Sequence, residues 1–353
     1  MRNIFACCSR GMGSILSKIS AAIPGVEEIF RLMKQGCLSV RENTSSIRDK
    51  TGNLLATNVD LGLYHFYRGS ISDAKTRFWL ISLVRPRLPE VHYNIGRCHL
   101  VLKRFDSAIV SFKKALSLDG NHKEARYYLN KVLSPESITE VPENVVKQYF
   151  NYTSEYFVEH WLISKNYRGH EHVRSLVMNF FDDRLSDIRI LDLGCGTGVC
   201  GQFLKMRDIG SHLTGVDISR RMLDIARQCF VYGKRAYNAL VCIGMHEFLR
   251  DNTEEFDVII MTEVLHYFGD LKEILTLVSK ALSSTGMVIG LVREAGSSGY
   301  QFIKEGDFFC HSSSYISQTV AATGFRLSYM NRCEIYGDKV QGLLFAISKD
   351  TEE

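Results

Sequence analysis

The sequence predicts an α/β protein in which an all-α region precedes a mostly parallel sheet. Two observations carry this prediction. From Ile188 onward, short apolar runs alternate with helical patterns, which is typical of βαβ units that build a parallel sheet covered on both faces. In the first third of the chain, similar residues recur 34 positions apart, as from Gly62 to Gly96, which indicates stacked helical hairpins.

The repeat appears when residues 58–89 are aligned with residues 92–123. The matched pairs are Gly62 with Gly96, Ala74 with Ala108, and Phe78 with Phe112. Glycine and alanine let two antiparallel helices cross closely, and the phenylalanine fills the gap to the next repeat. Because two repeats are fewer than the about three that usually stand alone, we expect capping helices. These are predicted at Val26–Ser39 and at the apolar stripe Ala125, Leu129, Val132 and Leu133.

Three regions are expected along the chain: a helical and linker segment (1–54), the repeats with a capping helix (55–135), and the α/β domain (136–353). The polar residues 41–53 are predicted to be a linker. Residues 133–143 contain two prolines and are predicted to be a hinge. Arrays of this kind usually present a concave surface to a peptide or partner helix, so a protein partner is one interpretation. Purely structural packing of the repeats is the other.

The composition is that of an ordinary soluble protein, with 45% hydrophobic and 23% charged residues. A net charge of +4 over 353 residues is too weak to indicate a nucleic-acid partner. The ten cysteines have neither zinc-site spacing nor a disulfide pattern, so we expect no metal and a cytoplasmic location. No apolar run reaches the about 18 residues of a membrane-spanning helix. The sequence contains no indication of oligomeric state.

The α/β domain is expected to close with an antiparallel pair of strands, which gives a seven-stranded sheet. The predicted strands are Ile188–Leu193, His212–Asp217, Ala239–Ile243, Phe256–Thr262, Met287–Arg293, Phe325–Tyr336 and Gln341–Ser348. The predicted helices between them are Cys200–Met206, Arg220–Phe230, Leu271–Leu282 and Ser313–Thr323. Ligands of such sheets bind at the carboxyl ends of the strands.

A glycine-rich loop, "LDLGCGTG", follows the first strand, and it contains Gly194, Gly196 and Gly198 in alternation. A dinucleotide-binding loop has its third glycine one position later, where this chain has Val199. A phosphate-binding loop requires a Gly-Lys-Ser/Thr ending, which is absent. The alternating glycines therefore disfavour both of these nucleotide sites.

This loop resembles the first motif of class I S-adenosylmethionine-dependent methyltransferases, which have a Rossmann-like fold. Asp217 ends the second strand in "LTGVDIS", where a carboxylate can bind both ribose hydroxyls. Glycines let the backbone approach the amino-acid tail of the cofactor. The resemblance implies S-adenosylmethionine as the cofactor. The implied contacts in these two motifs are Asp192, Gly194, Cys195, Gly196, Gly198, Asp217 and Ile218.

From about residue 58 to the end, the chain resembles a bacterial family of methyltransferases that carry N-terminal tetratricopeptide repeats. "VVKQYFNYTSEYFVEHW" and "NYRGHEHV" resemble the aromatic cap over the cofactor in that family, with Tyr152 as the best candidate contact. "EVLHYFGDL" and "HSSSYI" resemble two later segments.

Two positions depart from the pattern of that family. Gly244 stands where the family has an acid that accepts from the adenine amino group, so adenine is expected near Met245, His246 or Glu247, with weakened binding. An aromatic pair, Phe308 and Phe309, replaces a basic residue before the late histidine, which leaves the substrate open.

Methyl transfer needs an aligned nucleophile and, where the nucleophile carries a proton, a base. Glu263 is expected to face the cofactor after the fourth strand, and His266 and His311 are the candidate bases. His311 is expected to begin a helix, with Ser312 as its N-cap. Three interpretations stay open: a methyltransferase whose repeats dock a protein, a small-molecule methyltransferase with structural repeats, and a binding protein with a vestigial cofactor site.

Overall fold

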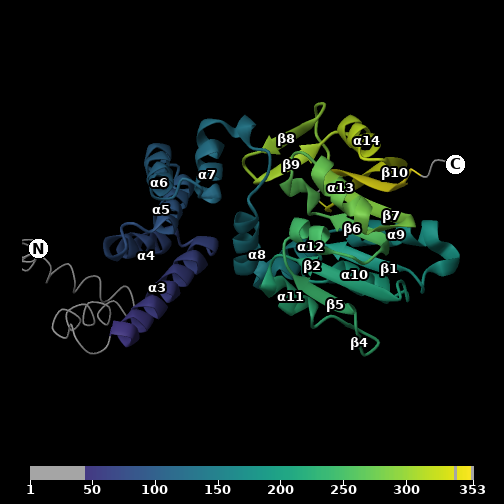
Figure 1. The fold of residues 1–353 in the computed structure, drawn as a ribbon, viewed down its shortest axis with the longest axis horizontal. Coiled ribbons are helices and arrows are strands. Elements are labelled where there is room, and N and C mark those ends of the chain that lie inside the picture. The colour runs from purple at the N-terminus through teal and green to yellow at the C-terminus, as the bar shows by residue number, and fades with distance from the viewer. Residues whose placement is uncertain (1–43, 338–339, 351–353) are drawn as a thin grey trace, which may run out of the picture. The chain divides into compact units, whose positions relative to one another are not determined.

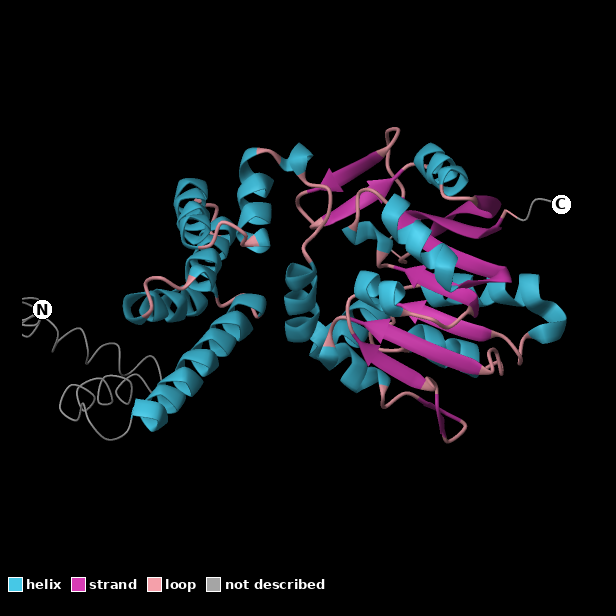
Figure 2. Ribbon diagram, viewed as in Figure 1, coloured by secondary structure: helices cyan, strands magenta, loops and turns pink. Residues whose placement is uncertain are grey.

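The computed structural model describes residues 44–337 and 340–350 (Figure 1). The chain divides into two compact units between Leu129 and Asn130. The described residues of the first unit form helices and no strands, and the second unit contains the sheet, as the colouring by secondary structure shows (Figure 2). The expected fold class, an α/β domain after an all-α repeat region, is confirmed.

Antiparallel helices form the first unit. They are α3 (Thr44–Tyr67), α4 (Ile71–Val84), α5 (Pro89–Val101), α6 (Phe105–Leu118) and α7 (Lys123–Leu133). A side chain on Gly62 would meet the ring of Phe78 at 2.7 Å, and one on Gly96 would meet Phe112 at 2.5 Å. The glycine of each repeat therefore lies against the phenylalanine of the same repeat, whereas the phenylalanine had been expected to fill the gap to the next repeat.

The ends of the repeat region differ in part from the expectations. Residues 44–53 belong to helix α3, so the linker prediction is wrong for that stretch. The predicted capping helix Val26–Ser39 lies outside the described residues. Helix α7 is present and buries Ala125, but Leu133 is 56% exposed. Tyr128 packs on Phe112 instead, with ring centroids 5.8 Å apart, because its ring reaches further than an aliphatic side chain from that position.

Replacing Gly96 with alanine should lower the free energy of unfolding of the repeat unit by about 1–3 kcal/mol, because the new methyl group overlaps the buried Phe112 ring. Gly120→Ala is the matched control, since nothing lies within 4 Å of its Cβ position and its backbone is not left-handed. Urea unfolding followed by circular dichroism measures both. Equal stabilities of the two variants would contradict the proposed close packing.

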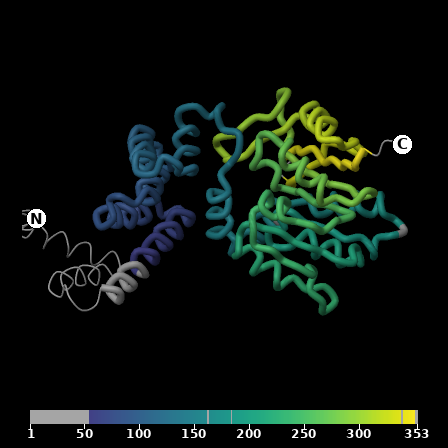
Figure 3. The backbone as a smooth tube through the Cα atoms, viewed as in Figure 1, coloured from purple at the N-terminus to yellow at the C-terminus, as the bar shows by residue number. Residues whose placement is uncertain are grey.

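The segment after α7 belongs to the second unit and is hydrogen-bonded to its interior. A short 3-10 turn η1 (Pro135–Ser137) precedes a bridge between Glu140 and Phe268. The Val141 amide donates to the Tyr267 carbonyl at 2.9 Å, and Val141 is buried. The end of the predicted hinge is therefore attached to the second unit. The continuous tube in Figure 3 traces this connection.

Helices α8 (Glu143–Phe157) and α9 (Gly169–Phe181) follow, joined by the π-helical turn η2 (Val158–Ser164), and the 3-10 turn η3 (Asp182–Arg184) leads to the sheet. The seven strands run in the order β10-β11-β7-β6-β1-β2-β5. They are β1 (Arg189–Leu193), β2 (His212–Asp217), β5 (Ala239–Cys242), β6 (Phe256–Thr262), β7 (Leu282–Arg293), β10 (Phe325–Glu334) and β11 (Gln341–Lys349). Strand β11 is antiparallel to β7 and β10, and the central strands are parallel.

Alternate residues of each central strand pack into opposite cores. On one face, Ile190 joins a core with side chains of α9, α10 (Val199–Lys205) and α11 (Arg220–Ala226). On the other face, Leu191 joins a core with α12 (Met245–Asp251), α13 (Lys272–Ala281) and α14 (Ser313–Ala322). Two covered faces explain why the central strands are continuously apolar.

Several boundaries differ from the predicted ones. The predicted helix Arg220–Phe230 ends at Ala226, because Phe230–Val231 forms strand β3, which pairs with β4 (Lys234–Arg235). Strand β7 begins at Leu282, which had been predicted to end a helix. Residues Tyr300–Ile303 (β8) and Phe308–His311 (β9) form a hairpin that the sequence pattern did not reveal. His311 therefore ends a strand and does not begin a helix, whereas Ser312 is the N-cap of α14, as expected.

Candidate active site

The glycine loop connects β1 to α10 at the carboxyl edge of the sheet. All three alternating glycines are left-handed, with φ of 75°, 53° and 84° at Gly194, Gly196 and Gly198. A side chain on Gly194 would meet Val264 at 2.9 Å, and one on Gly198 would meet Ala226 at 3.0 Å. Gly196 differs, because the nearest atom to its Cβ position is 4.0 Å away. The outer two glycines are needed for packing, and the middle one presents bare backbone to open space.

Asp217 lies under this bare backbone at the end of β2. Its Oδ2 accepts from the Gly196 amide at 2.9 Å, and its Oδ1 accepts from the Ser219 amide at 2.7 Å. Both carboxylate oxygens are thereby oriented, and each keeps a lone pair for a further donor. Burial raises the pKa of Asp217 to about 6, and the two amide hydrogen bonds oppose this rise. The arrangement suits a ligand with two adjacent hydroxyl groups.

Asp192, at the end of β1, points into the protein. Its Oδ2 accepts from the hydroxyl of Tyr237 at 2.6 Å, and that hydroxyl accepts from the Gly201 amide at the start of α10. Burial raises the pKa of Asp192 to about 7; the Tyr237 hydrogen bond lowers it and the charge of Asp217 raises it. Asp192 thus supports the loop from behind, and a direct ligand contact by Asp192 stays a prediction.

The raised pKa of Asp192 makes stability fall with pH. Between its unfolded pKa near 3.8 and its folded pKa near 7, the folded state holds a proton that the unfolded chain has released. The free energy of unfolding therefore falls as pH rises through this window. Relative to an Asp192→Asn variant, the wild type should lose about 1 kcal/mol or more between pH 5 and 7.5 in urea unfolding. Parallel pH profiles would contradict this assignment.

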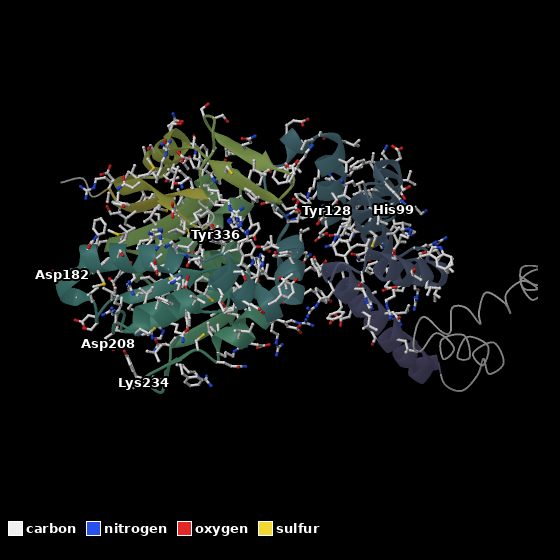
Figure 4. All side chains as sticks on the ribbon, turned by 180° about the vertical axis from the view of Figure 1, so that it is seen from behind. His99, Tyr128, Asp182, Asp208, Lys234 and Tyr336 are labelled. Carbon is white, nitrogen blue, oxygen red and sulfur yellow. The ribbon has the colours of Figure 1, made fainter. Side chains whose placement is uncertain are left out.

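At the other side of the loop, the ends of β6 and β7 and the connection between β10 and β11 bring together a largely buried polar cluster, which we define as Glu263, Arg293 and Tyr336. The Glu263 Oε2 accepts from the Tyr336 hydroxyl at 2.5 Å and from the Arg293 guanidinium at 3.3 Å. Figure 4 shows Tyr336 among the side chains of the sheet-containing unit. Glu263 has a left-handed backbone, φ 55°, which costs a non-glycine residue about 1–2 kcal/mol. Strain of this kind is typical of functional sites.

Unused hydrogen-bonding capacity remains in this polar cluster. Glu263 Oε1 and Arg293 Nε are buried and have no hydrogen-bond partner among the described residues. The guanidinium of Arg293 lies 4.0 Å from the centroid of the Phe308 ring, so this aromatic residue packs on a cation. Buried polar atoms without a partner are rare in folded proteins, so these two atoms call for a polar group that the chain itself does not supply.

Both candidate bases lie in the interior. His266, in the 3-10 turn η4 (Leu265–Tyr267), is 5% exposed and its Nδ1 has no partner among the described residues. Burial lowers its pKa to about 4, against the charge of Glu263. His311 is fully buried, its Nε2 is 3.1 Å from the Gly269 carbonyl, and burial lowers its pKa to about 4. Both imidazoles are neutral near pH 7, and their catalytic roles stay predictions.

The other predicted contacts are distributed around the loop. Tyr152, on α8, lies under the Arg221 guanidinium at 5.2 Å. Cys195 is buried against Gly215, and the Ile218 carbonyl lies 3.9 Å from the Cys242 sulfur. Met245 begins α12 and packs on the second core, and His246 stacks edge-on with Phe268. Sequence reasoning missed Arg293, whose signal is a charged residue at the end of an otherwise apolar strand.

These features agree with the comparison to known families. Residues 191–288 match the methyltransferase domain family, and residues 89–122 match the tetratricopeptide repeat. Residues 191–288 have the sequence pattern of a methyltransferase domain. The match begins in β1 and ends in β7, so this domain contains the glycine loop, Asp217 and Glu263. The expected combination of a class I methyltransferase domain with tetratricopeptide repeats is confirmed.

Two curated relatives that match this part of the chain are O-methyltransferases. The ubiquinone biosynthesis O-methyltransferase of Aromatoleum aromaticum is 28% identical over 31% of this chain and 47% of the relative. The malonyl-[acyl-carrier protein] O-methyltransferase of Acetivibrio thermocellus is 27% identical over 35% of this chain and 44% of the relative. The chain thus spans less than half of the length of either relative.

Among solved structures, the magnesium protoporphyrin IX methyltransferase of Synechocystis with bound S-adenosylmethionine has a TM-score of 0.46 and 15% identity. The match covers 59% of this chain and 97% of that one. Within residues 44–337 and 340–350, no helix combines the length and the apolar character that a membrane span needs.

Proposed function

We propose that this protein transfers the methyl group of S-adenosylmethionine to an oxygen atom of a small-molecule acceptor. The observation that carries the proposal is the bare backbone of Gly196 above the oriented carboxylate of Asp217. The methyltransferase domain family supports the activity, and the two O-methyltransferase relatives support oxygen as the acceptor atom.

The residues of the site fit this cofactor. The open space over Gly196 is a place that a side chain would fill, and Asp217 can accept from both ribose hydroxyls. Gly194 and Gly198 would hold the loop against the amino-acid tail. When bound, the cofactor supplies an electrophilic methyl group, so the protein itself needs to orient the acceptor and manage its proton.

The acceptor would lie over the ends of β6 and β7, beside the polar cluster of Glu263, Arg293 and Tyr336. Glu263 Oε1 and Arg293 Nε would orient its polar groups, because both atoms are buried without a partner among the described residues. His266 is neutral near pH 7, and its Nδ1 can accept the proton of an acceptor hydroxyl. We therefore assign His266 as the general base.

Replacing His266 with glutamine should lower the rate of methyl transfer about 100-fold or more, because glutamine cannot take the proton. The affinity for S-adenosylhomocysteine should stay within about twofold of the wild-type value. His160→Gln is the control, since this histidine is exposed on η2. Transfer of labelled methyl groups to the small molecules of a host extract measures the rate. An unchanged rate in the His266 variant would remove it as the base.

A second candidate is methylation of a protein that the repeats dock. The match to the tetratricopeptide repeat favours a protein partner, and α4–α6 expose several large apolar side chains: Trp79, Leu83, Val101, Phe105 and Val110. Comparing the full chain with residues 130–353 separates the two candidates. Loss of transfer to extract proteins, with small-molecule transfer retained, would favour docking by the repeats.

A further inference from the structure

Gly244 has no conformational need for glycine. It is the N-cap of α12, with φ −68° and ψ 145°, which any residue adopts. A side chain at position 244 is excluded by Glu143. A Cβ on Gly244 would lie 2.5 Å from Oε1 and 3.0 Å from Cδ of Glu143. The carboxylate of Glu143 therefore occupies the space into which a side chain at position 244 would project.

The position of Gly244 follows from the order of the strands. Strand β5 pairs with β2 so that Asp217 lies opposite Cys242, and the Ile243 amide donates to the Asp217 carbonyl at 3.1 Å. The glycine loop, Asp217 and Gly244 thus lie at the ends of three adjacent strands, β1, β2 and β5. A ligand whose tail lies on the loop and whose ribose lies on Asp217 extends its base toward Gly244.

Helix α8 holds Glu143 at this place because hydrogen bonds attach the chain just before the helix and near its middle. Before its start, the Val141 amide donates to the Tyr267 carbonyl. Further along, the Ser219 hydroxyl donates to the Asn151 side chain at 2.8 Å, and Arg221 donates to the Asn151 carbonyl at 3.1 Å. Helix α8 lies beside α11 as a result (Figure 1). Ser219 follows Asp217 by two residues, so the ribose site and α8 are directly connected.

The Glu143 carboxylate is also available to a ligand. It is exposed, and within residues 44–337 and 340–350 it takes part in no hydrogen bond or ion pair. A carboxylate only accepts hydrogen bonds. The amino group at position 6 of adenine donates, whereas the oxygen at position 6 of hypoxanthine accepts. A carboxylate at this place therefore distinguishes the two bases.

We propose that Glu143 accepts a hydrogen bond from the adenine amino group and so determines the selectivity of the site for adenine. This inference rests on the proposed function, that the site binds S-adenosylmethionine. The carboxylate comes from helix α8 across the space above Gly244, and strand β5 contributes only the room for it. The glycine is then a complement to Glu143 and not a defect of the site.

Calorimetric titration of the full chain with S-adenosylhomocysteine and with its hypoxanthine analogue, S-inosylhomocysteine, tests this. The wild type should bind the adenine form about tenfold more tightly, the value of one net hydrogen bond. In Glu143→Gln this ratio should fall to about one, because a glutamine amide can donate or accept. Glu136→Gln, an exposed exchange on η1, should keep the wild-type ratio.

A double variant places a carboxylate near the same position from the end of strand β5 in place of helix α8. Gly244→Asp combined with Glu143→Ala should restore the preference for adenine, since the new acid grows into the space that Glu143 has left. Retention of the wild-type ratio in Glu143→Gln would overturn the inference while leaving the proposed function intact. Absence of binding of either compound to the wild type would instead overturn the proposed function.

Discussion

Exchange of Asp217 for alanine should weaken binding of S-adenosylhomocysteine by about 100-fold or more. The variant loses two charge-assisted hydrogen bonds to the ribose hydroxyls, each of which contributes about 1.5–3 kcal/mol. It also loses the two bonds from the Gly196 and Ser219 amides that hold the loop over the end of β2. Calorimetry at pH 7.5 measures the affinity.

Two further variants separate these effects. Asp217→Asn keeps the shape of the side chain and one accepting oxygen, so its affinity should lie between those of the wild type and the alanine variant. Asp224→Ala, on the exposed side of α11, should bind as the wild type does. An Asp217→Ala variant with unchanged affinity would place the ribose elsewhere and contradict the proposed cofactor site.

Exchange of Gly194 for alanine should abolish cofactor binding and destabilise the second unit. Two costs add at this position: the left-handed backbone, φ 75°, and the overlap with Val264 at 2.9 Å. The first costs about 1–2 kcal/mol and the second about 1–3 kcal/mol. Relief of the overlap requires movement of the loop or of the segment that begins with Glu263. Either movement disturbs the site.

The chain contains a matched control for this prediction. Gly233 has almost the same φ, 76°, but nothing lies within 4 Å of its Cβ position. Gly233→Ala should therefore show only the backbone cost and bind S-adenosylhomocysteine normally. Thermal unfolding and calorimetry of the two variants isolate the packing contribution. Equal behaviour would show that the contact with Val264 is unimportant.

Local patterns identify much of this molecule because they depend on short spacings. The 34-residue period predicts the helical hairpins, since the matched residues of each repeat lie close together in the sequence. The alternating glycines of the loop and the acid at the end of the next strand likewise lie within about one βαβ unit. Secondary elements with weak signals, such as the β8–β9 hairpin, are missed because aromatic runs fit either a strand or a core helix segment.

The polar cluster could not be predicted in this way. Glu263, Arg293 and Tyr336 lie far apart in the sequence. Only the pairing of β6, β7, β11 and β10 brings the end of β6, the end of β7 and the connection after β10 together. The same holds for Tyr237, whose hydroxyl bridges the strand acid Asp192 and the start of α10. Long-range contacts of this kind have no periodic signature.

Gly244 shows most directly how the prediction from the sequence differs from the folded structure. In the sequence it is a missing acid, and the expectation that follows is a weaker adenine site. In the folded chain, Glu143 fills the space above it from a helix about 100 residues earlier, because the hydrogen bonds of Val141 and Asn151 attach α8 to the segments that follow β6 and β2. Residue type and spacing identify the glycine loop, whereas the group beside Gly244 depends on tertiary packing, which places the Glu143 side chain where a side chain at position 244 would project.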